Sequence, residues 1–195
     1  MIAIDFSMNS AGVVVGNSNN PAELQMLCFR QRKRDDSLVK NITVKEYLEC
    51  PKSDEERFYH IAKTIFDFID IHSTTKIVYI EDYSYGSTGS VFNIAEATGL
   101  LKHLLYMHGY VINKVSPKAL KKHATGSGNA SKGDMFNAFI DNTNYDFNRV
   151  FIGPQKAVKK GDEKIPAPFS DLIDAYFLLQ YGIKNSSDVP NRHAQ

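Results

Sequence analysis

Short apolar runs alternate with turn-forming residues at the start of the chain. The runs are Met1–Asp5, Ala11–Gly16 and Leu24–Phe29, and the turn signal Asn19-Asn20-Pro21 precedes the third. Runs of this length that are rich in β-branched residues and bounded by glycine, asparagine or proline are typical of strands. They predict three strands in quick succession, arranged as a meander. The charged segment over residues 30–36 has no period and predicts a loop.

The pattern becomes helical at Ser53. Ser53 and the glutamate three residues later form a capping box, and apolar residues then recur at helical spacing as far as His72. Residues 76–80 are a further apolar run and predict a fourth strand. A glycine- and serine-rich loop over residues 84–90 leads into a second helix, which ends at Gly109. The apolar composition of this helix predicts that it is deeply buried.

One more strand and three helices complete the predicted elements. They are expected as a strand at 110–115, a short helix begun by Ser116-Pro117, a helix capped by Ser131 and running through Ile140, and a last helix at 170–181 stopped by Gly182. The order of strands and helices predicts an α/β fold, with a five-stranded mixed sheet and helices on both faces. The 195 residues, 43% of them hydrophobic, fit a single domain over residues 1–183. Within it, residues 142–168 form a long loop or insertion, and residues 184–195 form a polar tail.

Composition restricts the cellular setting. No apolar run approaches the length of a membrane span, and no basic region with a signal-like apolar block stands at the N-terminus. We therefore expect a soluble, cytoplasmic protein with no membrane partner. Cys28 and Cys50 have no metal-ligand spacing and are interpreted as reduced thiols. The formal net charge of +1 does not by itself indicate a nucleic-acid-binding protein.

Carboxylates stand where strands or buried helices should present them. Asp5 ends the first predicted strand and Glu81 ends the fourth, while Asp171 and Asp174 lie three residues apart in the last helix. A carboxylate among apolar residues is costly to bury unless it is paired or binds a cation. Asp5 can alternatively cap a turn, and Asp171 suits a helix N-terminus beside the cap Ser170. Asp174 is harder to explain in this way, because its helix is apolar nearly all round.

If these four acids meet, their mutual repulsion calls for divalent cations. Oxygen-only ligation points to two Mg²⁺ ions, or Mn²⁺ as a substitute, rather than zinc. Two such metals can activate a water and stabilise the leaving oxygen of a phosphodiester, so nucleic-acid cleavage follows as a hypothesis. The alternative is that the acids are unrelated caps and surface groups. A lysine cluster is either a basic face for nucleic acid or a solvated helix surface; it comprises Lys114, Lys118, Lys121, Lys122 and Lys132.

Taken together, these motifs resemble the RuvC family of Holliday junction resolvases, within the RNase H-like superfamily. The resemblance rests on an acid after the first strand, a glutamate after the fourth and Asp-x-x-Asp-Ala in the last helix. Further support comes from the glycine-containing stretch 126–132, which ends in a lysine, and from Lys118 after the fifth strand. The matching residues are Ile4-Asp5, Ile80-Glu81, Asp171-Leu172-Ile173-Asp174-Ala175, Gly126 to Lys132 and Val115-Ser116-Pro117-Lys118.

The resemblance implies an RNase H-like fold and a homodimer that resolves four-way DNA junctions by paired, Mg²⁺-dependent nicks. It implies Asp5, Glu81, Asp171 and Asp174 as metal ligands, two cations per active site, and Lys132 as a catalytic lysine. It also implies phosphate contacts from Lys118 and Lys132, and the neighbouring Lys121 and Lys122 join the expected DNA-binding set. Tyr83 and Tyr85 occupy the loop whose aromatic residue helps to open the junction in this family; ordinary surface or interface packing is the alternative for both.

Two departures from the family pattern bear on the substrate. Phe6-Ser7 stands where the family commonly has Pro-Gly, and the segment 142–168 is longer than usual. These differences leave junction specificity less secure than nuclease chemistry. An RNase H-like nuclease acting on flap DNA, branched DNA or structured RNA is therefore an alternative. Two others come from different classes: a non-catalytic nucleic-acid-binding relative and a fragment of an actin-like kinase.

Overall fold

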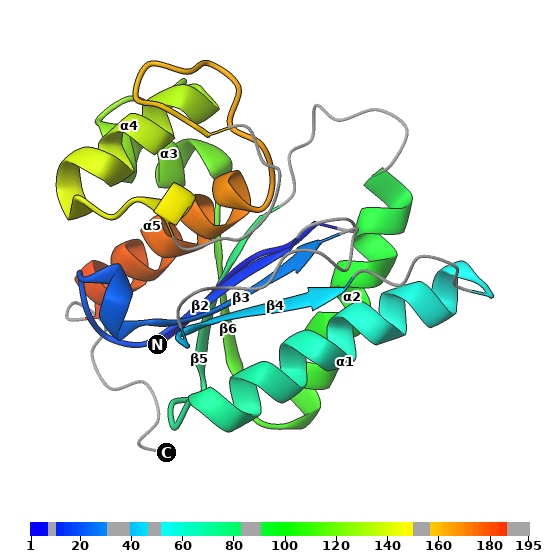
Figure 1. The fold of residues 1–195 in the computed structure, drawn as a ribbon. Coiled ribbons are helices and arrows are strands. Elements are labelled where there is room, and N and C mark those ends of the chain that lie inside the picture. Colours follow the sequence, from blue (N-terminus) through cyan, green and yellow to red (C-terminus); the bar gives the residue numbers. More distant parts are fainter. Residues whose placement is uncertain (8–10, 31–39, 47–51, 83–90, 150–156, 187–195) are drawn as a thin grey trace.

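A mixed β-sheet lies at the centre of the protein, between two layers of helices (Figure 1). The computed structural model describes residues 1–7, 11–30, 40–46, 52–82, 91–149 and 157–186. Six strands in the order β4-β3-β2-β1-β5-β6 form the sheet. They are β1 (Ile2–Asp5), β2 (Gly12–Val15), β3 (Gln25–Arg30), β4 (Ile42–Glu46), β5 (Ile77–Glu81) and β6 (Val111–Val115).

The predicted meander is confirmed, because β2 pairs antiparallel with both β1 and β3. The other three pairings, β3 with β4, β1 with β5 and β5 with β6, are parallel. The prediction of five strands was too low, because β4 was missed. This strand lies at the edge of the sheet, and Asn41 fixes its start by donating from its side-chain amide to the carbonyl oxygens of Pro21 and Leu24, at 3.1 and 2.9 Å. Strand β4 therefore depends on contacts with distant segments, and its short, mixed sequence does not predict it.

Five α-helices cover the two faces of the sheet. Helices α1 (Asp54–His72) and α2 (Val91–Met107) lie together on one face, and α5 (Phe169–Ser186) packs on the other with α3 (Pro117–Thr125) and α4 (Lys132–Thr143) beside it (Figure 1). Two 3₁₀ turns, Pro21–Glu23 and Phe147–Arg149, complete the described elements. The side chains of Ser53, Ser116 and Ser131 cap α1, α3 and α4 as predicted. No helix within the described ranges is both long enough and apolar enough to cross a lipid bilayer.

Alternation along the strands divides the buried side chains into two cores. Ile2 and Ile4 point to the core beneath α1 and α2, whereas Ala3 between them belongs to the core beneath α5. All three side chains are fully buried, so β1 is covered on both sides. Its last residue, Asp5, is the only partly exposed one of the strand.

Two expectations about helices were wrong. Gly182 does not stop the last helix, because α5 continues to Ser186. A Cβ atom on Gly182 would lie 2.6 Å from the ring of Tyr79, so the glycine instead lets α5 approach β5 closely. Nor is α2 buried all round: Phe92 is 81% exposed and Tyr106 is 73% exposed. Helix α2 buries one side against the sheet and α1, and its exposed side carries Phe92 and Tyr106.

Candidate metal centre

Two neighbouring parallel strands bring the first two carboxylates together. In the β1–β5 register Ile4 lies opposite Ile80, so the next residue on each strand, Asp5 and Glu81, ends its strand at the same edge of the sheet. The strands are adjacent and point the same way, as the pairing of βαβ units requires. Glu81 and Asp5 are therefore placed by backbone hydrogen bonding rather than by loop geometry.

Helix α5 delivers the third carboxylate. Its first turns cross β1 and β2, and Gly12 on β2 faces the backbone carbonyl of Asp171 so closely that any Cβ atom there would collide with it. The absence of a side chain at Gly12 thus lets the start of α5 lie directly on the sheet. One turn further along the helix, Asp174 reaches the edge where Asp5 and Glu81 end.

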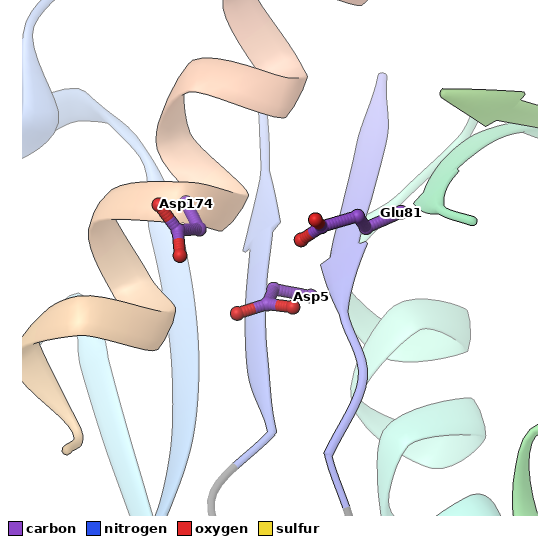
Figure 2. Close-up of side chains that lie close together, drawn as sticks. All are labelled: Asp5, Glu81 and Asp174. Atoms are coloured by element: carbon purple, nitrogen blue, oxygen red, sulfur yellow. The ribbon is translucent and has the colours of Figure 1, made fainter. Parts of the chain in front are cut away.

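Asp5, Glu81 and Asp174 form an acidic triad. Each side chain offers a carboxylate oxygen within 4.8 Å of those of the other two, and all three side chains are partly exposed. Figure 2 shows the three carboxylates turned toward a common space between β1, β5 and α5. Among the described residues this is the only group of three or more acidic, histidine or cysteine side chains with such spacing.

Burial and mutual repulsion raise the pKa values of the three carboxyl groups. Desolvation, followed by the negative charges of Asp174, Glu81 and Asp171, raises the pKa of Asp5 well above its ordinary value. Desolvation and the charge of Glu81 likewise raise the pKa of Asp174 to about 7. Desolvation also raises the pKa of Glu81, although a hydrogen bond from Asp5 opposes this effect. Without a cation, the triad therefore retains protons at pH values where isolated carboxylates are fully ionised.

These properties fit a hard divalent cation. The donor set consists only of carboxylate oxygens, which Mg²⁺ and Mn²⁺ prefer, and it contains no thiolate or imidazole that would favour zinc. A cation would replace the retained protons and relieve the repulsion that raises the pKa values. The raised pKa values and the carboxylate-only donor set are the two properties of the triad that suit a divalent cation.

Asp171, the fourth predicted ligand, lies beside the triad but outside it. Its side chain is only 6% exposed, and its Oδ1 accepts a hydrogen bond of 3.1 Å from the hydroxyl of Ser170. Its negative charge contributes to the raised pKa values of Asp5 and Asp174. The structure therefore places Asp171 within electrostatic reach of the other acids, while its carboxylate is held by a neighbouring side chain.

Two of the predicted lysines lie within electrostatic reach of the triad. The positive charges of Lys121 and Lys132 act to lower the pKa of Glu81 and of Asp174. Lys118 and Lys122 are instead exposed on α3. Lys121, which was also predicted to bind DNA, is half-buried on the same helix. The two tyrosines of the family comparison, Tyr83 and Tyr85, lie outside the described residues.

Ser170 is a site residue whose role the sequence did not reveal. The sequence predicts Ser170 as a helix cap, but α5 begins one residue earlier, at Phe169, and the Ser170 side chain forms hydrogen bonds with two other side chains. Its hydroxyl donates to Asp171 and accepts a hydrogen bond of 3.3 Å from the ammonium of Lys132. Because Lys132 lies 38 residues away in the sequence, no local signal could have identified the contact.

Comparison with known proteins supports the predicted resemblance. Over 95 residues the chain is 25% identical to a crossover junction endodeoxyribonuclease RuvC of Prochlorococcus marinus strain AS9601, a match that covers 49% of this chain and 60% of that protein. A second RuvC, of strain MIT 9312, is 26% identical over 91 residues, which cover 47% of this chain and 57% of that protein. The chain thus spans less than two thirds of these relatives. No family model matches the sequence.

The resemblance in fold extends over nearly the whole chain. The structure of Thermus thermophilus RuvC matches with a TM-score of 0.59 at 14% identity, covering 95% of this chain and 97% of that one. A structure of T. thermophilus RuvC in complex with Holliday junction substrate matches equally well, with 96% of each chain covered. The chain therefore has the α/β RNase H-like fold of RuvC, and the resemblance predicted from its motifs is confirmed.

Proposed function

We propose that this protein is a Mg²⁺-dependent, structure-selective endodeoxyribonuclease that resolves four-way DNA junctions by paired nicks. The observation that carries the proposal is the acidic triad of Asp5, Glu81 and Asp174 at the edge of a sheet with the RuvC fold. The similarity to curated RuvC proteins over about half of the chain supports the same chemistry. Because a structure of T. thermophilus RuvC contains Holliday junction substrate, junction DNA is the first substrate to test.

In the proposed site, Asp5, Glu81 and Asp174 hold two Mg²⁺ ions, or Mn²⁺ as a substitute, with Asp171 as an additional ligand. The bound metals would supply the activation of water and the stabilisation of the leaving oxygen in phosphodiester hydrolysis. The chain's own part is to hold these carboxylates on two strand ends and one helix, so that little reorganisation accompanies binding. Lys121 and Lys132, whose charges act on Glu81, would attract the scissile phosphate.

DNA would approach along the exposed lysines of α3. Lys118 and Lys122 are exposed on this helix, near Lys121. The three lysines make this part of the surface positively charged, although the whole chain is nearly neutral. Phosphate contacts of this kind position a duplex without reading its sequence. Tyr83 and Tyr85 are proposed to stack on bases near the opened junction centre, in keeping with the family comparison.

Paired nicking requires two active sites, and the exposed stripe of α2 supports a homodimer. Phe92, Glu96, Gly99, His103 and Tyr106 recur at intervals of three and four residues, so they lie along one side of the helix. Phe92 and Tyr106 are largely exposed at its two ends, and space is open around Gly99 in the middle. The stripe is suited to a second copy of α2, because glycine permits close helix approach while the aromatic residues provide buried area.

Cleavage assays with different DNA shapes test the proposal. Purified protein would be incubated with labelled four-way junction, flap and linear duplex DNA, with and without Mg²⁺. We expect Mg²⁺-dependent, symmetric nicks in the junction only. Equal cutting of all three substrates would overturn junction selectivity and leave a general nuclease. Tight junction binding with no cleavage in Mg²⁺ or Mn²⁺ would indicate a non-catalytic relative instead.

A further inference from the structure

The structure assigns to Ser170 the role of a positioning residue that anchors Lys132 and Asp171 together beside the acidic triad. This inference rests on the proposed nuclease function and identifies how one of its lysines is held in place. The Ser170 side chain is only 4% exposed. Its hydroxyl oxygen lies 3.3 Å from Lys132 Nζ and 3.1 Å from Asp171 Oδ1.

A serine hydroxyl suits both contacts at once. It has one hydrogen to donate, which goes to the Asp171 carboxylate, and lone pairs that accept from the Lys132 ammonium. Lysine carries its charge on a flexible four-carbon stem and has no fixed orientation of its own. The buried hydroxyl therefore supplies the orientation and keeps the positive charge adjacent to the carboxylates.

The backbone that carries Lys132 is also fixed against the start of α5. Gly133, the next residue of α4, packs against the segment 157–166, and a Cβ atom there would lie 2.5 Å from the carbonyl oxygen of Asp162. The side-chain oxygen of Asn137 accepts a hydrogen bond of 3.0 Å from the backbone N–H of Gly161. The same segment leads directly into α5 at Phe169, next to Ser170 (Figure 1).

This segment falls within the part of the chain that was predicted to be a long loop or insertion. Residues 157–166, called the strap here, pack against Gly133 and Asn137 of α4 and lead into α5, close to Lys132 and Ser170. Two contacts thus fix the position of Lys132. The strap holds its backbone, and Ser170 holds its ammonium group. The hydroxyl is the component that a single substitution can remove without disturbing the strap.

Acylation of individual lysines tests the anchor without relying on activity. DNA-free protein would be treated with trace acetic anhydride, and the extent of modification at Lys132 would be read by mass spectrometry. We expect Ser170→Ala to raise the reactivity of Lys132 at least threefold, with Lys118 unchanged as an internal control. Ser170→Thr, which keeps the hydroxyl, should behave like the wild type. Equal reactivity of Lys132 in the wild type and Ser170→Ala would overturn the assignment.

A double-mutant cycle then tests whether Ser170 acts through Lys132. On four-way junction DNA at saturating Mg²⁺, we expect Ser170→Ala to lower kcat about tenfold with little change in KM, and Ser170→Thr to restore most of it. In a Lys132→Ala background the same change should cost less than about twofold, because the group that it positions is gone. Ser186→Ala, at the far end of α5, is the matched control and should be neutral.

The outcomes separate this inference from the proposed function. Multiplicative losses in the double mutant would show that Ser170 does not work through Lys132. Thermal unfolding of each variant would identify a general loss of folding, which would affect kcat and Lys118 reactivity alike. If the wild type cleaves no DNA, the nuclease proposal fails, yet the acylation result still decides whether Ser170 anchors Lys132.

Discussion

Asp5 and Glu81 end adjacent parallel strands, and a carboxylate oxygen of one lies within 4.8 Å of a carboxylate oxygen of the other. Desolvation and three acidic neighbours raise the pKa of Asp5 well above its ordinary value, so Asp5 is the group of the pair that retains a proton. The proton occupies the place of positive charge that a divalent cation would take. Proton and metal are therefore expected to compete for the triad, and this competition can be measured.

The first prediction concerns stability against pH in the absence of metal. The folded protein holds protons on Asp5 and Asp174 that the unfolded chain, with ordinary carboxyl pKa values near 4, would release. The contribution of these two groups to the free energy of unfolding should therefore be largest below about pH 4. It should fall as the pH rises through their raised pKa values, about 7 for Asp174. We expect a decrease of about 1–2 kcal/mol, since each pKa unit corresponds to about 1.4 kcal/mol and partial exposure of the triad weakens the effect. Urea unfolding with EDTA at pH 5 and pH 8 measures it.

Added Mg²⁺ should reverse this trend at pH 8 and have little effect at pH 5, where protons occupy the site. Ligand binding to the folded state alone raises the unfolding free energy with concentration. Asp174→Asn should abolish the metal-dependent stabilisation. An equal stabilisation of this variant and the wild type by Mg²⁺ would place the metal elsewhere.

The second prediction concerns the carboxylates in catalysis. Asp5→Asn and Asp174→Asn each remove a charge from the triad, and each should abolish junction cleavage while junction binding persists. Both should also stabilise the metal-free protein at pH 8, because they remove repulsion. Asp171→Asn distinguishes a ligand from a bystander: loss of cleavage matched by weaker Mn²⁺ binding in calorimetry would make it the fourth ligand. Retention of wild-type nicking by any of the three would remove that residue from the metal site.

The third prediction separates the lysines of α3. The charge of Lys121 acts on Glu81 and Asp174, whereas Lys118 is exposed. Lys121→Ala should therefore lower kcat by about tenfold or more, and Lys118→Ala should chiefly weaken junction binding. The salt dependence gives the measurement: removing a phosphate contact should reduce the slope of log affinity against log salt by about 1. The reverse pattern, with kcat lost at Lys118 and unchanged at Lys121, would contradict the arrangement of α3.

A fourth prediction tests the packing that carries Asp174. Gly182→Ala would bring a methyl group against the Tyr79 ring, so α5 would have to shift away from β5. We expect a loss of about 1–3 kcal/mol in unfolding free energy, as for overpacked cores. Combining it with Tyr79→Leu, which clears the ring, should restore part of the loss. Additive losses in the double variant would show that the ring is not the obstacle.

The fifth prediction concerns the stripe of α2. Gly99→Arg places a large charged side chain in the open space at the middle of the stripe, without contact to the core of the same subunit. Light scattering should show a dimer for the wild type and a species near the chain mass of 21.9 kDa for the variant. Each subunit should still bind Mg²⁺, since the triad lies within one chain. A wild type that is monomeric at micromolar concentration would overturn the proposed dimer.

Local sequence patterns predicted most of the strands and helices. The apolar runs and serine caps predicted five of the six strands and all five helices, because period and capping depend on neighbouring residues. The positions of Asp5 and Glu81 at strand ends were equally local. By contrast, β4 depends on pairing with β3, and the role of Gly182 depends on a ring more than a hundred positions away, so neither could be identified from its own segment.

The sequence by itself predicted the four candidate acids, because strand ends and an i, i+3 helical pair are properties of short segments. The structure brings Asp5, Glu81 and Asp174 together and places Asp171 beside them. Only the tertiary structure decided how they are arranged. The approach of α5 over Gly12 brings Asp174 to the strand ends, while Asp171 accepts a hydrogen bond from Ser170. Packing of α3 brings the charge of Lys121 within reach of Asp174. The physical reason is that helix rotation and the distance between layers are set by packing against residues far away in the chain. The retained protons likewise arise from burial and mutual charge, which exist only once the strands and helix have met.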